Sequence, residues 1–251
     1  MVNFVGAGCG APDLITVRGA RLLSEADVII YAGSLINTEL LKYAKKDCEL
    51  FNSAFLNLDE IIEIIKKAEN KNKMTVRLQT GDTSIYSALR EQTERLDELN
   101  IPYEICAGVS SFCGAAAALK AEYTLPDVTQ TVIITRIAGR TAVPEKEKIS
   151  SLAAHNATMI IFLSAGLINE VTAELLSGGY DKKTPAAIVY KATWTDEKIF
   201  RCTLEKLAET AEENGIKKTA LICVGDFLGN DHSLSKLYDK EFETEYRKVQ
   251  K

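Results

Sequence analysis

The stretch VGAGCGAPDLITVRGA, residues 5–20, decides the fold of the amino-terminal half of the chain. A short apolar segment runs into Gly6, Gly8 and Gly10, and a helical pattern follows. The order strand, glycine turn, helix is typical of nucleotide sites, because glycines let the backbone approach a ligand at the start of a helix. The stretch therefore predicts a nucleotide-like ligand at the end of the first strand.

The same residues satisfy the dinucleotide pattern G-x-G-x-x-[G/A] literally. Their context differs, because Pro12 and Asp13 stand where the helix of that motif would begin. The next strand, 27–32, also runs into Gly33 without the carboxylate that binds the ribose hydroxyls of a dinucleotide. A nicotinamide-binding oxidoreductase stays an alternative, and the residues favour a ligand without a pyrophosphate.

Composition and charge restrict the class of protein. The 251 residues carry a net charge of −5, which gives no reason to expect nucleic-acid binding. No apolar run reaches the roughly 18 residues that span a bilayer, and the first residues do not resemble a signal peptide, so we expect a cytoplasmic protein without a membrane partner. None of the six cysteines forms a C-x-x-C motif, so we expect reduced thiols and no metal site.

Apolar segments of strand length alternate with helical patterns along the whole chain. Strands are expected at 2–5, 27–32, 74–80, 103–106, 130–136, 157–164, 186–192 and 219–225, and the alternating segment KIFRCTL, 198–204, suggests an antiparallel strand. This alternation predicts an α/β fold with largely parallel sheets. A break at KAEYTLPDV, 120–128, divides the chain into two α/β domains, 1–121 and 122–251.

Small and polar residues follow several of these strands. Thr80, Gly81 and Asp82 come at the end of one strand, and Ser110 and Ser111 follow the next. Ligands of open parallel sheets bind beyond the carboxyl ends of the strands, so a backbone-lined cleft for an adenosine-like ligand is expected there. Asp82 either offers a carboxylate to that ligand, caps a helix expected at 84–99, or does both.

Three cations are candidates for binding carboxylates of a substrate. Arg136 and Arg140 lie in ITRIAGRTAVP, 134–144, and Lys191 lies in YKATW, 190–194. Arginine binds carboxylates through a bidentate fork, so a local basic patch is one interpretation. Solvated surface charge is the other.

The chain resembles the tetrapyrrole methylase family over essentially its whole length. GAGCGAPDLITVRG is similar to the first motif of the family. More specific segments are YAGSLIN, RLQTGD, REQ, EYTLPDV, IITRIAGRTAVP, YKATW and TALICVG, at 31–37, 77–82, 90–92, 122–128, 133–144, 190–194 and 219–225. These are similar to the members that methylate carbon 11 of precorrin-4 or cobalt-precorrin-4 in cobalamin biosynthesis.

The resemblance implies an S-adenosylmethionine-dependent C-methyltransferase with two α/β domains, the cofactor in the cleft between them, and a homodimer. Carried over motif by motif, the implied cofactor neighbours are Cys9, Thr80, Gly81, Asp82, Ile85, Ser110, Ser111, Leu163, Ser164, Ala192 and Ala220. A polyanionic tetrapyrrole substrate would meet Arg136, Arg140 and Lys191. The resemblance assigns no catalytic acid, base or nucleophile.

Two residues depart from the usual pattern of the family. Cys9 and Ala107 each replace a loop proline, and each loop thereby loses a fixed φ at a cost of about 1 kcal/mol or less. We expect the fold and the site to persist. The alternatives are another tetrapyrrole methylase acting on uroporphyrinogen or a different precorrin, a diphthine synthase, and a non-catalytic tetrapyrrole-binding protein.

Overall fold

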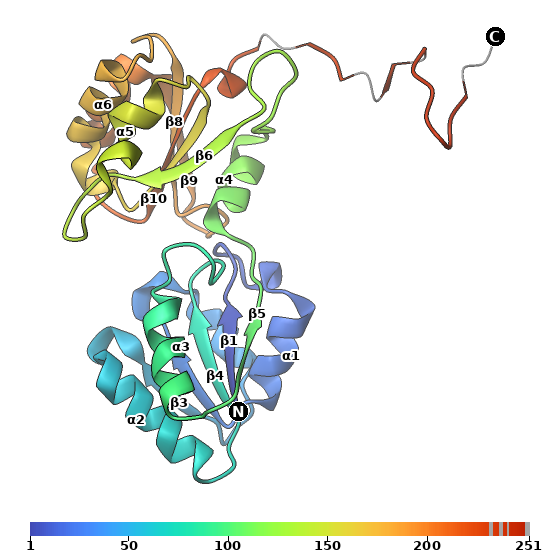
Figure 1. Ribbon diagram of the computed structural model, residues 1–251, viewed down its shortest axis with the longest axis vertical. Helices are drawn as coiled ribbons and strands as arrows, with labels where there is room; N and C mark the ends of the chain where they lie inside the picture. The colour runs from blue at the N-terminus through green and yellow to red at the C-terminus, as the bar shows by residue number, and fades with distance from the viewer. Residues whose placement is uncertain (231–232, 236–237, 240, 249–251) are drawn as a thin grey trace. The chain divides into compact units, whose positions relative to one another are not determined.

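The computed structural model describes residues 1–230, 233–235, 238–239 and 241–248. The chain forms two compact units, each with one five-stranded sheet (Figure 1). The first unit contains Met1–Ala118 and the returning segment Lys191–Lys198, and the second contains Leu119–Tyr190 and the chain from Ile199 onward. None of the described helices combines the length and the apolar character that a membrane-spanning helix needs. The division into domains 1–121 and 122–251 stays a prediction.

The sheet of the first unit is entirely parallel, with strand order β3-β2-β4-β1-β5. Its strands are β1 (Val2–Gly6), β2 (Val28–Tyr31), β3 (Glu49–Asn52), β4 (Thr75–Gln79) and β5 (Tyr103–Cys106). β1 has a neighbour on either side and is buried throughout, as its apolar run predicts. Because all five strands are parallel, their carboxyl ends lie along one edge of the sheet.

Helices cover both faces of this sheet (Figure 1). α1 (Val17–Glu25) lies on one face, in a core cluster with Val5 of β1. α2 (Leu58–Glu69) and α3 (Leu89–Glu98) lie on the other, in a cluster with Phe4 of β1. Phe4 and Val5 are neighbours along the strand, so their side chains point to opposite faces, and each face requires its own helical layer.

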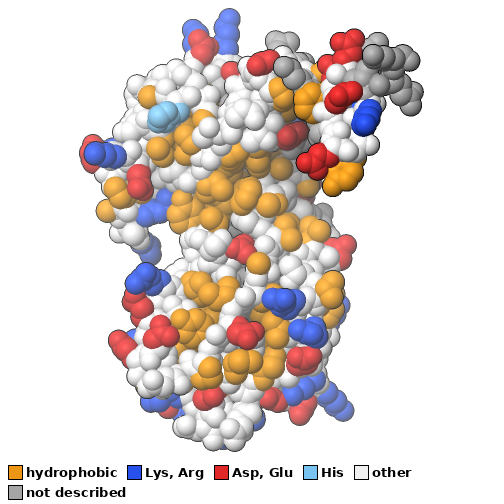
Figure 2. Space-filling model, turned by 45° about the vertical axis from the view of Figure 1, so that its right-hand side comes forward, with side chains coloured by type: hydrophobic (Ala, Val, Ile, Leu, Met, Phe, Trp, Pro, Cys, Tyr) orange, Lys and Arg blue, Asp and Glu red, His pale blue; other side chains and the backbone are white. Residues whose placement is uncertain are grey.

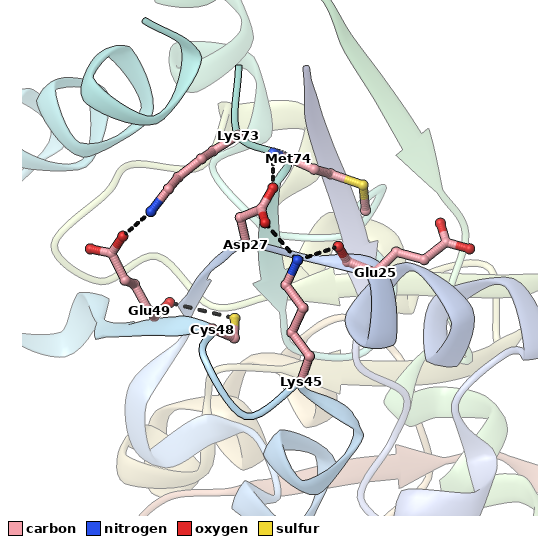
Figure 3. A network of polar contacts seen from close by, with 7 residues as sticks. All are labelled: Glu25, Asp27, Lys45, Cys48, Glu49, Lys73 and Met74. Atoms are coloured by element: carbon pink, nitrogen blue, oxygen red, sulfur yellow. Dashed lines mark hydrogen bonds and ion pairs between the residues drawn. The ribbon is translucent and has the colours of Figure 1, made fainter. Parts of the chain in front are cut away.

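A charged network joins the opposite, amino-terminal ends of these strands (Figure 3). Asp27, just before β2, accepts hydrogen bonds from Lys45 Nζ at 2.6 Å and from the Met74 N–H at 2.7 Å. The bond from Lys45 is the largest of the effects that lower the pKa of Asp27. Lys73, just before β4, donates to Glu49 of β3. Asp27 therefore links strands at the edge away from the glycine loops, where it cannot bind a ligand of those loops.

The sheet of the second unit is mixed, with strand order β6-β7-β10-β8-β9. Its strands are β6 (Val132–Arg136), β7 (Thr158–Phe162), β8 (Pro185–Tyr190), β9 (Lys198–Thr203) and β10 (Ala220–Val224). β6 and β7 are parallel, whereas β10 runs antiparallel to both β7 and β8. The α/β class predicted from the sequence is confirmed, and the reversed central strand is a feature that its apolar run does not reveal.

The core of the second unit lies between this sheet and three helices. These are α5 (Ile149–Ala153), α6 (Ile168–Ser177) and α7 (Leu207–Glu213), which share one apolar cluster with Met159 of β7. α4 (Ser111–Leu119) follows β5 and ends where the second unit begins.

α3 begins at Leu89, later than the helix predicted at 84–99. Ala88, directly before it, has a left-handed φ of 52°. The Gln92 side chain donates to the Ala88 carbonyl at 2.9 Å, and the Gln79 side chain donates at 2.9 Å to the carbonyl before that. Two side-chain amides thus hold the segment in a non-helical form, so Asp82 does not cap α3.

Candidate functional site

Three strand ends of the first sheet meet backbone to backbone. At Gly6, the last residue of β1, an added Cβ would lie 2.6 Å from Gly108 Cα and 2.6 Å from the Gly81 carbonyl oxygen. At Gly108, after β5, it would lie 2.2 Å from that same oxygen. These distances leave no room for a side chain. Gly6 and Gly108 therefore allow the loops to pack against one another, which differs from the ligand approach expected of Gly6.

Two hydrogen bonds fasten the first glycine loop to the loop after β4. The Gly8 N–H donates to the Gly81 carbonyl at 3.1 Å, and the Gly81 N–H donates to the Gly8 carbonyl at 3.0 Å. Both residues have positive φ, 82° and 64°, a conformation that favours glycine. A Cβ on Gly81 would lie 3.6 Å from both Ser110 Cα and the Ser111 nitrogen. Gly81, Ser110 and Ser111 thus gather at one edge with the first loop.

Asp82 connects the same two loops through its carboxylate. Its Oδ2 accepts the Gly108 N–H at 2.7 Å, and its Oδ1 accepts the Ser84 N–H at 2.9 Å and the Ser84 hydroxyl. Burial by itself raises the pKa of Asp82, but these hydrogen bonds outweigh it, and the pKa lies below its ordinary value. Of the neighbouring candidates, Thr80 is exposed and Ile85 is half-buried.

The loop after β4 is also held by a buried cation that the sequence did not indicate as functional. Arg77 of β4 donates from Nε to Gln92 Oε1 at 2.9 Å and from Nη1 to the Ile30 carbonyl at 3.2 Å. Burial lowers the pKa of Arg77 to about 10, so it stays protonated at neutral pH. Gln92 in turn holds the Ala88 carbonyl. The RLQTGD and REQ motifs are thus two halves of one hydrogen-bonded framework, which their spacing alone does not reveal.

The segment Lys191–Lys198 contributes the remaining candidates of the first unit. A Cβ on Gly10 would lie 2.6 Å from the carbonyl oxygen of Ala192, which is itself buried. Cys9 is only 7% exposed, and its sulfur accepts a hydrogen bond from the Thr193 hydroxyl at 3.6 Å. Lys191 Nζ lies 2.6 Å from a carboxylate oxygen of Asp196, so its charge is already paired within the segment.

The candidates of the second unit gather at one edge of its sheet. Arg136 ends β6 and pairs in register with Phe162, the last residue of β7. Ala220 begins the antiparallel β10 beside Tyr190, the last residue of β8. Leu163 follows β7 at this edge, 72% exposed and with a positive φ of 53°. An exposed leucine in a left-handed conformation is an unfavourable arrangement of the kind that clusters at functional sites.

Ser164 and Arg136 shape the loop that carries Arg140. The fully buried Ser164 hydroxyl accepts the Ile137 N–H at 2.9 Å and donates to the Phe162 carbonyl at 2.6 Å. The Arg136 guanidinium donates at 3.0–3.2 Å to three carbonyls of its own loop, at residues 137, 141 and 142. Arg140 is exposed and has no ion pair with any residue in the described part of the chain.

The charge of the first-unit loops selects the kind of ligand they suit. Segments 6–11, 79–87 and 106–112 contain no lysine or arginine, and their only charged side chain at neutral pH is Asp82. Such an edge disfavours a pyrophosphate and favours a ligand that carries positive charge. In the ranges that the structure describes, no three His, Cys, Asp or Glu side chains are placed to hold a metal ion.

Comparison with known proteins defines the class. The sequence model of the Tetrapyrrole (Corrin/Porphyrin) Methylases matches residues 1–208. The chain therefore belongs to the tetrapyrrole methylase family. A relative from Methanocaldococcus jannaschii named cobalt-precorrin-4 C(11)-methyltransferase is 56% identical over 251 residues, which cover 100% of this chain and 97% of that protein.

Solved structures agree with this relationship. The X-ray structure of a cobalt precorrin-4 methyltransferase is similar with a TM-score of 0.89 and 44% identity, covering 91% of this chain and 96% of that one. A uroporphyrin-III C-methyltransferase from Thermus thermophilus, solved in complex with S-adenosylhomocysteine, has a TM-score of 0.76 and 24% identity over 91% of this chain and 93% of that one. The second likeness shows the shared fold.

The close approach of the strand ends predicts that Gly108→Ala is strongly destabilising. Its methyl group would lie 2.2 Å from the Gly81 oxygen, so the loops must separate. We expect a loss of about 2–4 kcal/mol in the free energy of unfolding, measured by urea denaturation. Gly139→Ala is the matched control, because a Cβ there meets no atom within 4 Å. Equal stability of the two variants would contradict the packing described here.

The lowered pKa of Asp82 predicts a pH-dependent effect of Asp82→Asn. A carboxyl whose pKa is lowered by folding contributes stability that is fully present above its unfolded pKa and is lost as pH falls through its folded pKa. The variant should lose about 1.5–3 kcal/mol of unfolding free energy at neutral pH, and this deficit should shrink at about pH 3. Urea unfolding at both pH values measures it. Asp47→Asn, at an exposed position, should have no deficit at either pH.

Proposed function

We propose that this protein transfers a methyl group from S-adenosylmethionine to carbon 11 of cobalt-precorrin-4, in the synthesis of the corrin ring of cobalamin. The observation that carries the proposal is the full-length 56% identity to a relative with this named activity. The geometry agrees with it, because small residues at the strand ends form an edge without cations. The homodimer that the family resemblance implies and the cytoplasmic location expected from the sequence belong to this proposal.

The residues proposed to hold the cofactor fit its chemistry. S-adenosylmethionine, when bound, supplies a methyl group on a positively charged sulfur. The loops offer backbone groups, the Ser110 and Ser111 hydroxyls and the carboxylate of Asp82, a set that suits a cationic nucleoside. We assign Asp82 to positioning the cofactor and not to proton abstraction, since its oxygens already accept hydrogen bonds from the Gly108 and Ser84 N–H groups. The proposed set is completed by Cys9, Thr80, Gly81, Ile85, Leu163, Ser164, Ala192 and Ala220.

The chemistry makes modest demands on the protein. A ring carbon of the substrate is already electron-rich, so the chain's contribution is to exclude water and hold the reacting atoms in line. Neither an activated nucleophile nor a general base is assigned. Rigid loops with a defined backbone path serve this purpose, and the bonds between Gly8 and Gly81 supply that rigidity.

The substrate bears acetate and propionate groups, so a few placed cations must recognise it. Lysines, arginines and carboxylates intermix over the face in view, without a field of one sign (Figure 2). We assign recognition of these groups to Arg136, Arg140 and Lys191. Arg140 is the strongest of the three, because Arg136 donates to its own loop and Lys191 is paired with Asp196.

The nicotinamide oxidoreductase is disfavoured by three features. β4 lies between β1 and β2, whereas the dinucleotide fold places its first two strands side by side. A 3₁₀ turn, Pro12–Leu14, separates the glycine loop from α1. β2 runs into Ala32 and Gly33, with no carboxylate at its end.

Binding and turnover test the proposal directly. Calorimetry should detect binding of S-adenosylhomocysteine and no binding of NAD. In an activity assay that compares cobalt-precorrin-4 with metal-free precorrin-4, the enzyme should methylate cobalt-precorrin-4. Mass spectrometry and NMR of the product should place one new methyl group on carbon 11. Binding of NAD alone, or methylation at another carbon, would reject the assignment, and faster turnover of metal-free precorrin-4 would move it to the metal-free substrate.

The substrate assignment predicts a selective effect of Arg140→Ala. Removing one charged hydrogen-bond donor should raise the KM for cobalt-precorrin-4 about fivefold to tenfold and leave the Kd of S-adenosylhomocysteine unchanged. Lys183→Ala is the control, since this exposed lysine precedes β8 at the opposite edge of the sheet. A weakened Kd with an unchanged KM would assign Arg140 to the cofactor instead.

A further inference from the structure

The segment Lys191–Lys198 leaves β8, packs with the first unit and returns to begin β9. Its contacts to the first glycine loop join residues more than 180 positions apart. The Ala11 N–H donates to Thr193 Oγ1 at 2.9 Å, and the Thr193 hydroxyl donates to Cys9 Sγ at 3.6 Å. One hydroxyl thus holds two residues of the loop at once.

Trp194 covers the residue between those two. A Cβ on Gly10 would lie 2.3 Å from Trp194 Cδ1 and 2.6 Å from Nε1, so the indole rests directly on the glycine backbone. Gly10 has a φ of 155°, in a region that other residues rarely adopt. The contact therefore stabilises a backbone conformation that glycine alone would leave with many alternatives.

Bonds within the segment hold these two side chains in position. The Thr193 N–H donates to Glu197 at 2.6 Å, and the Trp194 N–H donates to the Lys191 carbonyl at 3.0 Å. Lys191 Nζ pairs with Asp196 and lies 5.3 Å from the centre of the Trp194 ring. Thr193 and Lys191 both have positive φ, 68° and 47°. Such unfavourable conformations persist only where the surrounding contacts impose them.

We propose that Lys191–Lys198 is a latch that holds the first glycine loop in its ligand-binding form, with Thr193 and Trp194 as positioning residues. Gly8 is fixed by its bonds to Gly81, whereas Gly10 is held by Trp194, so without the latch only a fraction of molecules would hold the binding-competent backbone at residues 9–11. The apparent Kd of a ligand rises as that fraction falls. The effect on S-adenosylmethionine rests on the function proposed above, whereas the latch itself is a property of the free protein.

Trp194 is the single tryptophan of the chain, so its fluorescence reports on the latch alone. Thr193→Val removes the hydroxyl at nearly constant volume, and Thr193→Ser keeps it. Thr93→Val on α3 is the control, because among the described residues that hydroxyl bonds only to the Arg90 carbonyl within its own helix. We expect Thr193→Val to increase acrylamide quenching of Trp194 in the free protein, with Thr193→Ser and Thr93→Val close to wild type.

The same variants test the link to ligand binding. Thr193→Val should weaken S-adenosylhomocysteine binding in calorimetry about fivefold to thirtyfold, the loss expected for one or two hydrogen bonds, and Thr193→Ser should restore it. A purely structural role would lower the melting temperature of Thr193→Val and leave both quenching and Kd unchanged, which would overturn the proposal. If wild-type protein binds no S-adenosylhomocysteine, the proposed function fails, and quenching still decides whether the latch exists.

Discussion

Close packing of the Gly6 and Gly108 backbones against the Gly81 carbonyl is the constraint on which the site depends. It brings the ends of β1, β4 and β5 nearer than any side chain would allow, and it lets Gly8 and Gly81 exchange hydrogen bonds across the gap. The loops become an extension of the sheet, with its rigidity. A site that works by holding a ligand in line needs such rigidity more than it needs reactive side chains.

The parts of the fold visible in the sequence are those encoded locally. The run through Val5 into Gly6 correctly predicts a buried strand and a turn, and Asn57 with Glu60 forms a capping box at α2. β3 escapes prediction because it is a short, partly exposed edge strand, and β10 reads as one apolar run whichever way it points. Local pattern specifies burial and period, while strand direction is decided by distant partners.

The candidate site likewise combines residues that the local sequence predicts with pairings that it does not. Gly81, Asp82, Ser110 and Ser111 are predictable because they lie within five residues after β4 or β5, and parallel strands bring their ends to one edge. The pairing of Arg77 with Gln92 is not predictable, since it needs the start of α3 to be known. Neither is the internal pairing of Lys191 with Asp196, because a sequence records charges without saying which are already satisfied.

Cys9, which the family resemblance places where other members have a proline, illustrates how a distant contact can order a loop. A proline at this position would fix φ by itself, whereas cysteine leaves the loop freer in the unfolded chain. In this structure the sulfur accepts the Thr193 hydroxyl and lies against Gly114, where an added Cβ would be 2.9 Å from it. A proline ring would restrict the backbone of this loop covalently; here packing and a hydrogen bond from the latch restrict it instead. The first glycine loop and Lys191–Lys198 therefore form one structural element, although more than 180 positions of sequence separate the residues in contact.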